Sequence, residues 1–138
     1  MRRRAAAALF LASAAFGAAP AVAQPELKAR ISPKLGDPAT VFRVGFTAPK
    51  AARPGVAYSV ALSVSGSGCK QDVSQDVTQA KAGERVRTRF MPSEPWCRGR
   101  GRALVYMHEW QPCAPPFDMC PGSPEFSRVI ARIRFSVR

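Results

Sequence analysis

The chain has 138 residues, and its 21 Lys and Arg residues against 9 Asp and Glu give a formal net charge of +12. This length allows one domain with a modest core and excludes two domains of ordinary size. A strongly basic balance favours anionic partners such as nucleic acid, acidic cell-wall polymers or lipid headgroups. A basic surface that is merely solvated is the simpler alternative.

Residues 1–23 carry the pattern of a secretory signal peptide. Arginines at positions 2–4 precede an apolar run over 5–19, and the small residues Ala-Val-Ala follow at 21–23. The run is shorter than the ~20 residues that span a bilayer. We therefore predict cleavage before Gln24 and export of a single domain, residues 24–138, into the medium or cell envelope, with no membrane span. Without the three leader arginines, 18 basic and 9 acidic residues remain, a net charge of +9.

Polar and apolar residues alternate with period two over six stretches, which predicts strands with one face on a core and one in water. The stretches are 27–32, 40–48, 57–65, 84–91, 102–111 and 126–137. Segments rich in Pro and Gly separate them and are typical of turns. The residues expected to face the core are Leu27, Ala29, Ile31, Phe42, Val44, Phe46, Tyr58, Val60, Leu62, Val64, Val86, Thr88, Phe90, Val129, Ala131, Ile133, Phe135 and Val137.

Two stretches depart from simple alternation. In 102–111 both sets of alternate residues include large apolar or aromatic side chains, so this strand is expected to be covered on both faces. Residues 71–78 form a polar near-repeat, QDVS followed by QDVT. We interpret it as a polar crossover or a short edge strand between two sheets, with a short helical turn as the alternative.

Six or seven short strands in residues 24–138 indicate two stacked antiparallel sheets. In this strand pattern the chain resembles the immunoglobulin-like and fibronectin-III-like domains found in secreted bacterial proteins of unknown role. The resemblance covers most of the exported chain and implies an all-β sandwich. It implies an architecture, which does not fix an activity.

The four cysteines of an exported chain are expected to form two disulfides, and counting alone leaves three pairings. In the sandwich that the chain resembles, the strands at 57–65 and 102–111 are antiparallel neighbours. That arrangement brings Cys69 and Cys97 together at one end. Cys113 and Cys120 then pair within the loop at the opposite end.

The loop after 102–111 is the first candidate site. Trp110, Phe117 and Met119 are large apolar groups that can anchor a partner. Four prolines and a disulfide restrict the loop, which lowers the ordering cost of binding. Lys50 and Arg53, from the loop before 57–65, are expected at the same end. We predict contact here with an extracellular protein or polymer; in the alternative, Trp110 and Phe117 fold back and cap the core.

Arginines supply the second candidate site. Arg98, Arg100 and Arg102 alternate with glycines and could bind anions. Further arginines line the outer faces of 84–91 and 126–137, which belong to different sheets in the implied sandwich. Nucleic acid is not expected, because Phe90 and Phe135 fall on the inward register and leave no stacking surface. A phosphate-rich wall polymer or a lipid headgroup suits an exported protein better.

Other chemistries have less support. Met107, His108 and Met119 near two cysteines are soft ligands of the kind that suits copper, but the chain has one histidine and paired cysteines offer no thiolate. We predict no metal and no cofactor. Enzyme activity is not expected, because a nucleophile–base pair would depend on that one histidine and no serine has a nucleophile-elbow pattern.

The sequence thus predicts a secreted, non-enzymatic binding or structural domain that contacts its partner through the loop end. The alternative is electrostatic binding to an anionic polymer or membrane surface. Less favoured is a protease inhibitor, for which the triplet at 119–121 resembles the region before the reactive bond of subtilisin inhibitors. The cysteine spacings of 28, 16 and 7 disagree with that family.

Overall fold

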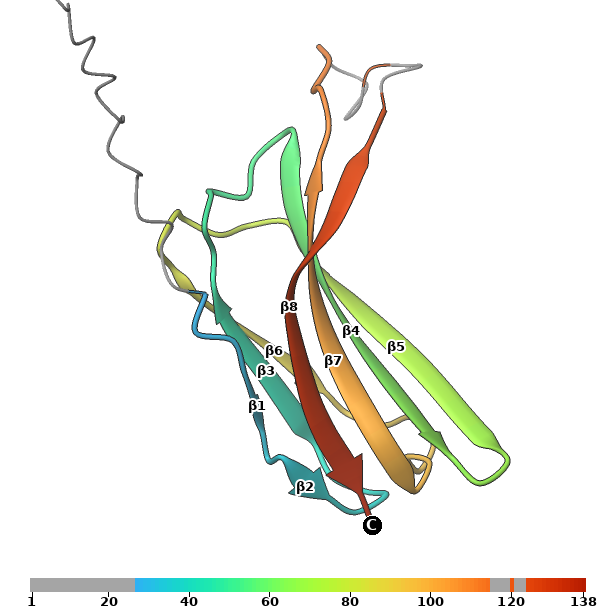
Figure 1. Ribbon diagram of the computed structural model, residues 1–138. Helices are drawn as coiled ribbons and strands as arrows, with labels where there is room; N and C mark the ends of the chain where they lie inside the picture. The colour runs from blue at the N-terminus through green and yellow to red at the C-terminus, as the bar shows by residue number, and fades with distance from the viewer. Residues whose placement is uncertain (1–26, 115–119, 121–123) are drawn as a thin grey trace, which may run out of the picture.

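The computed structural model describes residues 27–114, 120 and 124–138 (Figure 1), so the predicted signal peptide lies outside the described residues. Six strands match the predicted stretches, with ends shifted by at most three residues. None of the described residues belongs to a helix long and apolar enough to cross a membrane. The strands are β1 (Arg30–Ser32), β2 (Leu35–Gly36), β3 (Phe42–Thr47), β4 (Val56–Gly66), β5 (Cys69–Val77), β6 (Arg85–Phe90), β7 (Gly99–Glu109) and β8 (Phe126–Val137).

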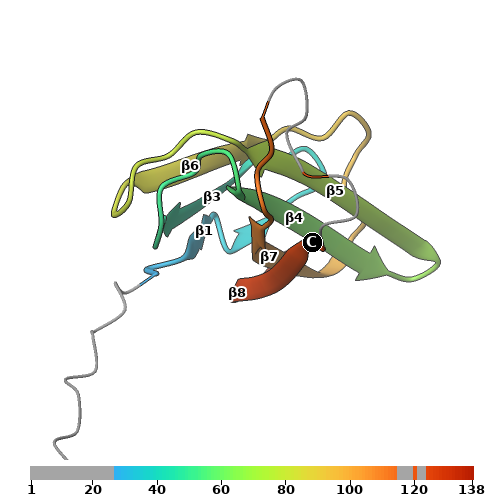
Figure 2. The same ribbon diagram turned by 90° about the horizontal axis from the view of Figure 1, so that it is seen from above.

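The strands form two sheets, which Figures 1 and 2 show as separate layers. One sheet has three strands in the order β1-β3-β6, and the other has five in the order β2-β8-β7-β4-β5. All paired strands are antiparallel except the two-residue β2, which runs parallel to β8. This parallel pair departs from the predicted antiparallel sheets. It arises because the chain continues from β1 to the edge of the other sheet without turning back.

The polar stretch at 71–78 is part of β5, a nine-residue edge strand that forms a hairpin with β4. It is longer than the predicted edge strand and does not cross between the sheets. Side-chain hydrogen bonds hold it in place: the Gln71 amide donates to the Pro95 carbonyl (3.0 Å), and the Gln75 amide donates to the Arg89 carbonyl (2.6 Å). A polar sequence is compatible with a strand here because β5 has one edge without a partner strand and most of its residues are exposed on both faces.

The core lies between the sheets and is built from the residues that alternation places inward. The predicted core residues of β3, β4 and β6 are all buried. In β7 the inward residues are Ala103, Val105 and Met107. On the opposite face Leu104, Tyr106 and His108 are half-buried and the arginines are exposed, so the cover predicted for both faces is only partial. Leu27, Ala29, Ala131 and Ile133 are only partly buried against this core.

The largest departure from the predicted faces is in β8. Two successive β7 residues pair with Ala131 and Val129, so Ile130 is an extra residue without a cross-strand partner. A bulge of this kind shifts the alternation by one residue. Val129, predicted to face the core, therefore lies on the outer face, and Arg128, predicted to face outward, takes the inner register beyond the bulge.

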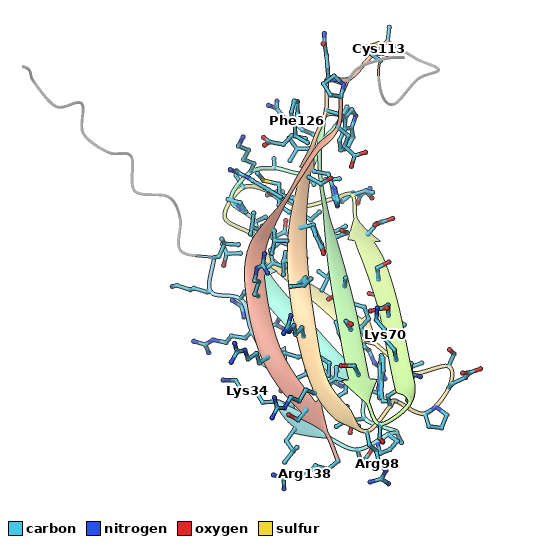
Figure 3. The ribbon with its side chains drawn as sticks, turned by 45° about the vertical axis from the view of Figure 1, so that its right-hand side comes forward. Lys34, Lys70, Arg98, Cys113, Phe126 and Arg138 are labelled. Atoms are coloured by element: carbon cyan, nitrogen blue, oxygen red, sulfur yellow. A yellow bond between two sulfur atoms is a disulfide. The ribbon has the colours of Figure 1, made fainter. Side chains whose placement is uncertain are left out.

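The disulfides join Cys69 to Cys97 and Cys113 to Cys120, which is the predicted pairing. They lie at opposite ends of the sheets; Figure 3 labels Cys113 at one end and Arg98, the neighbour of Cys97, at the other. We call these the loop end, with Cys113–Cys120, and the core end, with Cys69–Cys97. Two disulfides favour an oxidising, extracellular compartment.

Candidate functional site

An open hollow of about 770 Å³ lies on the outer face of the five-stranded sheet. Three cationic and three hydroxyl side chains gather around it because the alternation of β4, β7 and β8 is in register there. We call this set the Arg102 face. It consists of Ser63, Ser65, Arg100, Arg102, Arg134 and Ser136.

Two cross-strand rows build the Arg102 face. In one row Ser63 of β4 pairs with Arg102 of β7, which pairs with Arg134 of β8. In the next row Arg100 lies between two serines. Residues two apart on a strand are about 6.6–6.8 Å apart, and neighbouring strands lie about 5 Å apart. The arginines therefore form a compact array rather than a scatter of surface charges.

Small side chains beside the arginines keep the hollow open. Only Ala and Ser face outward along β4, so that strand forms a shallow floor next to the long side chains of β7. On the inner side Gly101 lies against the Phe135 ring, where an added Cβ would come within 2.6 Å of ring carbons. The outward residues of β4 are Ala57, Ser59, Ala61, Ser63 and Ser65.

None of the arginines of the Arg102 face forms an ion pair with a carboxylate of the described residues. Arg102 and Arg134 lie directly opposite each other, an arrangement of like charges that destabilises a sheet. The ion pairs found in the described part of the chain are Lys50–Glu109, Lys70–Asp72 and His108–Glu125. Hydrogen bonds from Ser63 and Lys70 hold the pKa of Asp72 below its usual range, so this carboxylate is already engaged.

Sequence reasoning found part of this site. Arg100 and Arg102 line the hollow, whereas Arg98 precedes β7 and does not. Arg134 was not among the predicted anion-binding residues. Its alternation showed only that it faces water; its position opposite Arg102 depends on the pairing of β7 with β8.

The loop end joins the two loops that were predicted to meet there. The Trp110 N–H donates to the Gly55 carbonyl (3.0 Å), and Lys50 forms an ion pair with Glu109. This hydrogen bond from Lys50 holds the pKa of Glu109 below its usual range. Lys50 is thus engaged within the molecule, Arg53 is exposed, and Trp110 is half-buried.

A smaller hollow of about 230 Å³ lies beside Trp110. Its other lining residues include Pro124 and Phe126, and the Phe126 side chain is 66% exposed. Phe126 was not predicted as a contact residue. The predicted contact residues Phe117 and Met119 lie outside the described residues.

His108 is held by polar groups on the outer face. Its Nε2 lies 2.8 Å from the Ser59 hydroxyl, and its Nδ1 lies 2.7 Å from the Ser127 hydroxyl and 3.1 Å from Glu125 Oε1. The order Ser–His–Glu resembles a hydrolase triad. Ser59, however, is in the middle of β4, whose backbone pairs with β5 on one side and β7 on the other. The network therefore connects β4, β7 and β8 and presents no backbone donors to a substrate oxyanion.

The residues considered for copper are separated by the strand geometry. Met107 is buried in the core, whereas its neighbour His108 lies on the opposite face of β7. Cys113 and Cys120 are joined in a disulfide. Across residues 27–114, 120 and 124–138, no three His, Cys, Asp or Glu side chains are grouped to hold a metal ion.

Comparisons with known proteins identify no relative of this chain. The chain has no significant match to a protein-family model, to a curated protein or to a solved structure.

Proposed function

We propose that this chain is an exported, non-enzymatic domain of the immunoglobulin-like sandwich class that binds an extended phosphate-bearing polymer through the Arg102 face. The observation that carries the proposal is the directly opposed pair Arg102 and Arg134 in an open hollow. The two disulfides support export, and the order of strands in the two sheets supports the sandwich class.

The position of Arg102 argues against a purely protective role. Charged residues on edge strands prevent sheets from joining edge to edge. Arg102 is on β7, which lies between β4 and β8 and has no free edge. An anion bridging Arg102 and Arg134 would turn an unfavourable contact into a favourable one. Anion binding would therefore explain why two arginines lie opposite each other.

Arginine and serine suit a phosphodiester better than a simple counter-ion. The planar guanidinium presents paired donors that match two phosphate oxygens, and the hydroxyls of Ser65 and Ser136 add further donors. Each row runs across the strands, and one row follows the other along the strand direction, so successive phosphates of a stretched polymer can contact successive rows. A single small anion would use only one of them.

The proposal is tested by retention on immobilised poly(glycerol phosphate) at increasing salt. The double variant Arg102→Gln/Arg134→Gln is compared with Lys34→Gln/Lys81→Gln, which removes the same charge from exposed loops. We expect at least roughly tenfold weaker binding for the first, because each charge-assisted hydrogen bond contributes about 1.5–3 kcal/mol. The slope of log affinity against log salt should also fall by roughly 1.

Three outcomes contradict the proposal: retention that ignores ionic strength, equal losses in the two double variants, or binding to phosphatidylglycerol vesicles without binding to the polymer. Arg102→Lys/Arg134→Lys keeps the charge and loses the planar fork, so it should recover only part of the affinity. Unfolding of the Gln variant is measured alongside. Relief of the like-charge contact should leave its free energy of unfolding unchanged or raise it by a few tenths of a kcal/mol.

A second candidate function is contact with a protein partner at the loop end. The exposed Phe126 ring beside Trp110 favours it, because aromatic anchors dominate protein interfaces. Phe126→Ser should abolish capture of such a partner while leaving the polymer affinity unchanged. Capture that persists in this variant would assign Phe126 no role in binding.

A further inference from the structure

The outer face of the three-stranded sheet carries a second group of arginines, on the side of the molecule away from the Arg102 face. Alternation in β1, β3 and β6 places them together, and none of these three strands contains Asp or Glu. We call this group the Arg43 face. It consists of Arg30, Arg43, Arg85, Arg87 and Arg89.

The Arg43 face repeats the central feature of the first site. Arg43 lies directly opposite Arg89, as Arg102 lies opposite Arg134. Arg43 is on β3, the middle strand of its sheet, so edge protection does not explain it. Neither face gains stability from its opposed pair.

Glycine opens the centre of the Arg43 face. Gly45 lies between Arg30 and Arg87 in one cross-strand row. A Cβ on Gly45 would lie 3.1 Å from Arg85 Nη2, so the absence of a side chain at Gly45 lets that guanidinium lie close over the strand. Arg85 is held there by a hydrogen bond from Nη1 to the Lys28 carbonyl (2.7 Å). A hollow of about 260 Å³ remains among these residues and Ser32.

We propose that the Arg43 face is a second site for the same class of phosphate-bearing polymer and that one molecule joins two polymer chains. The inference rests on the proposed function of the Arg102 face. The inner faces of the two sheets share one core, so their outer faces point in opposite directions (Figure 2). A straight polymer segment on one face cannot contact the other, and simultaneous occupation therefore requires two segments.

Capture of a second polymer chain tests the inference directly. Beads coated with poly(glycerol phosphate) are loaded with protein, and fluorescent soluble poly(glycerol phosphate) is then added. The wild-type protein should bring fluorescence to the beads. At high protein concentration the signal should fall again, because each polymer chain then carries its own protein molecules.

Two variants of equal charge separate the two sites. Arg43→Gln/Arg89→Gln and Arg102→Gln/Arg134→Gln should each still bind the beads through the remaining face, but at least roughly tenfold more weakly than the wild type, because only one face then contacts the coated surface. Neither variant should capture soluble polymer. The loop variant Lys34→Gln/Lys81→Gln should capture as the wild type does.

The outcomes distinguish the two proposals. Capture that persists in either face variant overturns the inference, because bridging would then come from one face, for example in a dimer. Bead binding by the wild type without capture also overturns it and leaves the Arg102 face as the only site. Absence of bead binding by the wild type overturns the proposed function itself.

Discussion

A disulfide lies at each end of the two sheets, but only one of the two joins separate elements of the fold. At the core end, Cys69 of β5 joins Cys97, which is 3% exposed and lies in the segment from β6 to β7. Trp96 beside it is equally buried, packs edge-on against Phe42 and donates from its indole N–H to the Thr40 carbonyl (2.8 Å). Cys97 is therefore part of the core, and the disulfide fastens the connection between the two layers to Cys69, an exposed residue of the edge strand β5.

At the loop end, Cys113–Cys120 spans only seven residues within the connection from β7 to β8. Both of these strands belong to the five-stranded sheet, so this disulfide shapes a loop without joining the layers. Its neighbours Trp110 and Phe126 remain half-buried or exposed. A disulfide at one end is therefore anchored in the core, whereas the disulfide at the other end closes a loop whose aromatic neighbours stay accessible to solvent.

Truncation of the two tryptophans should separate the ends most clearly. Trp96→Ala removes a buried ring and a buried hydrogen bond, and should lower the free energy of unfolding by about 3–5 kcal/mol. Trp110→Ala removes a half-buried ring and should cost under about 2 kcal/mol. Urea denaturation measures both, and equal losses would contradict the distinction between the ends.

Removal of the disulfide should also lower the free energy of unfolding more at the core end than at the loop end, but the difference between the ends should be smaller than for the tryptophans. Loop-closure entropy predicts a loss of about 3.5 kcal/mol for Cys69→Ala/Cys97→Ala and about 2.5 kcal/mol for Cys113→Ala/Cys120→Ala. The burial of Cys97 should widen this gap. A larger loss on opening the short loop would show that the loop end, too, supports the core.

Tyr58 connects the core to the loop end and should have an intermediate effect. Its hydroxyl donates to the Lys50 carbonyl (2.7 Å) and accepts from the Lys50 N–H (3.0 Å). Tyr58→Phe leaves both backbone groups without this partner and should cost about 1–3 kcal/mol. The control is Tyr106→Phe, whose half-buried ring lies on the outer face and should change stability little.

The same residue predicts a response to alkali. Burial raises the pKa of Tyr58, so the folded protein holds this proton more tightly than the unfolded chain, whose value is near 10.0. The stability linked to Tyr58 is complete below that pH and is lost as the pH rises above it. The free energy of unfolding, measured by urea denaturation at pH values from 9 to 11, should therefore decrease less steeply with pH for Tyr58→Phe than for Tyr106→Phe.

The smallest expected effect concerns the Lys50–Glu109 ion pair of the loop end. Because the pKa of Glu109 is lowered in the folded state, its contribution is complete above the unfolded value of 4.5 and is lost as the pH falls through the folded value. A surface pair of this kind contributes a few tenths of a kcal/mol. Glu109→Gln should remove that part of the acid dependence, and an unchanged pH profile would show that the pair has no net effect.

Much of the fold could be predicted because its main signals are local. Period-two alternation identified six of the strands and the inward residues of β3, β4 and β6. It failed at β5, whose residues carry no alternation because most of them are exposed on both faces of the strand. It also failed at Val129, because a bulge depends on how β7 and β8 meet and leaves no mark in the local pattern.

The candidate site divides in the same way. By itself, the sequence determined that the arginines of β6, and Arg132 and Arg134 of β8, face water, since alternation is a property of one strand. It also placed both disulfides once an antiparallel order was assumed. Only the tertiary structure decided which arginines face each other. Arg102 meets Arg134, and Arg43 meets Arg89, through pairings between strands more than thirty residues apart. Register is a non-local property that is set when two strands pack over a common core, so no inspection of either strand alone could have found the two faces.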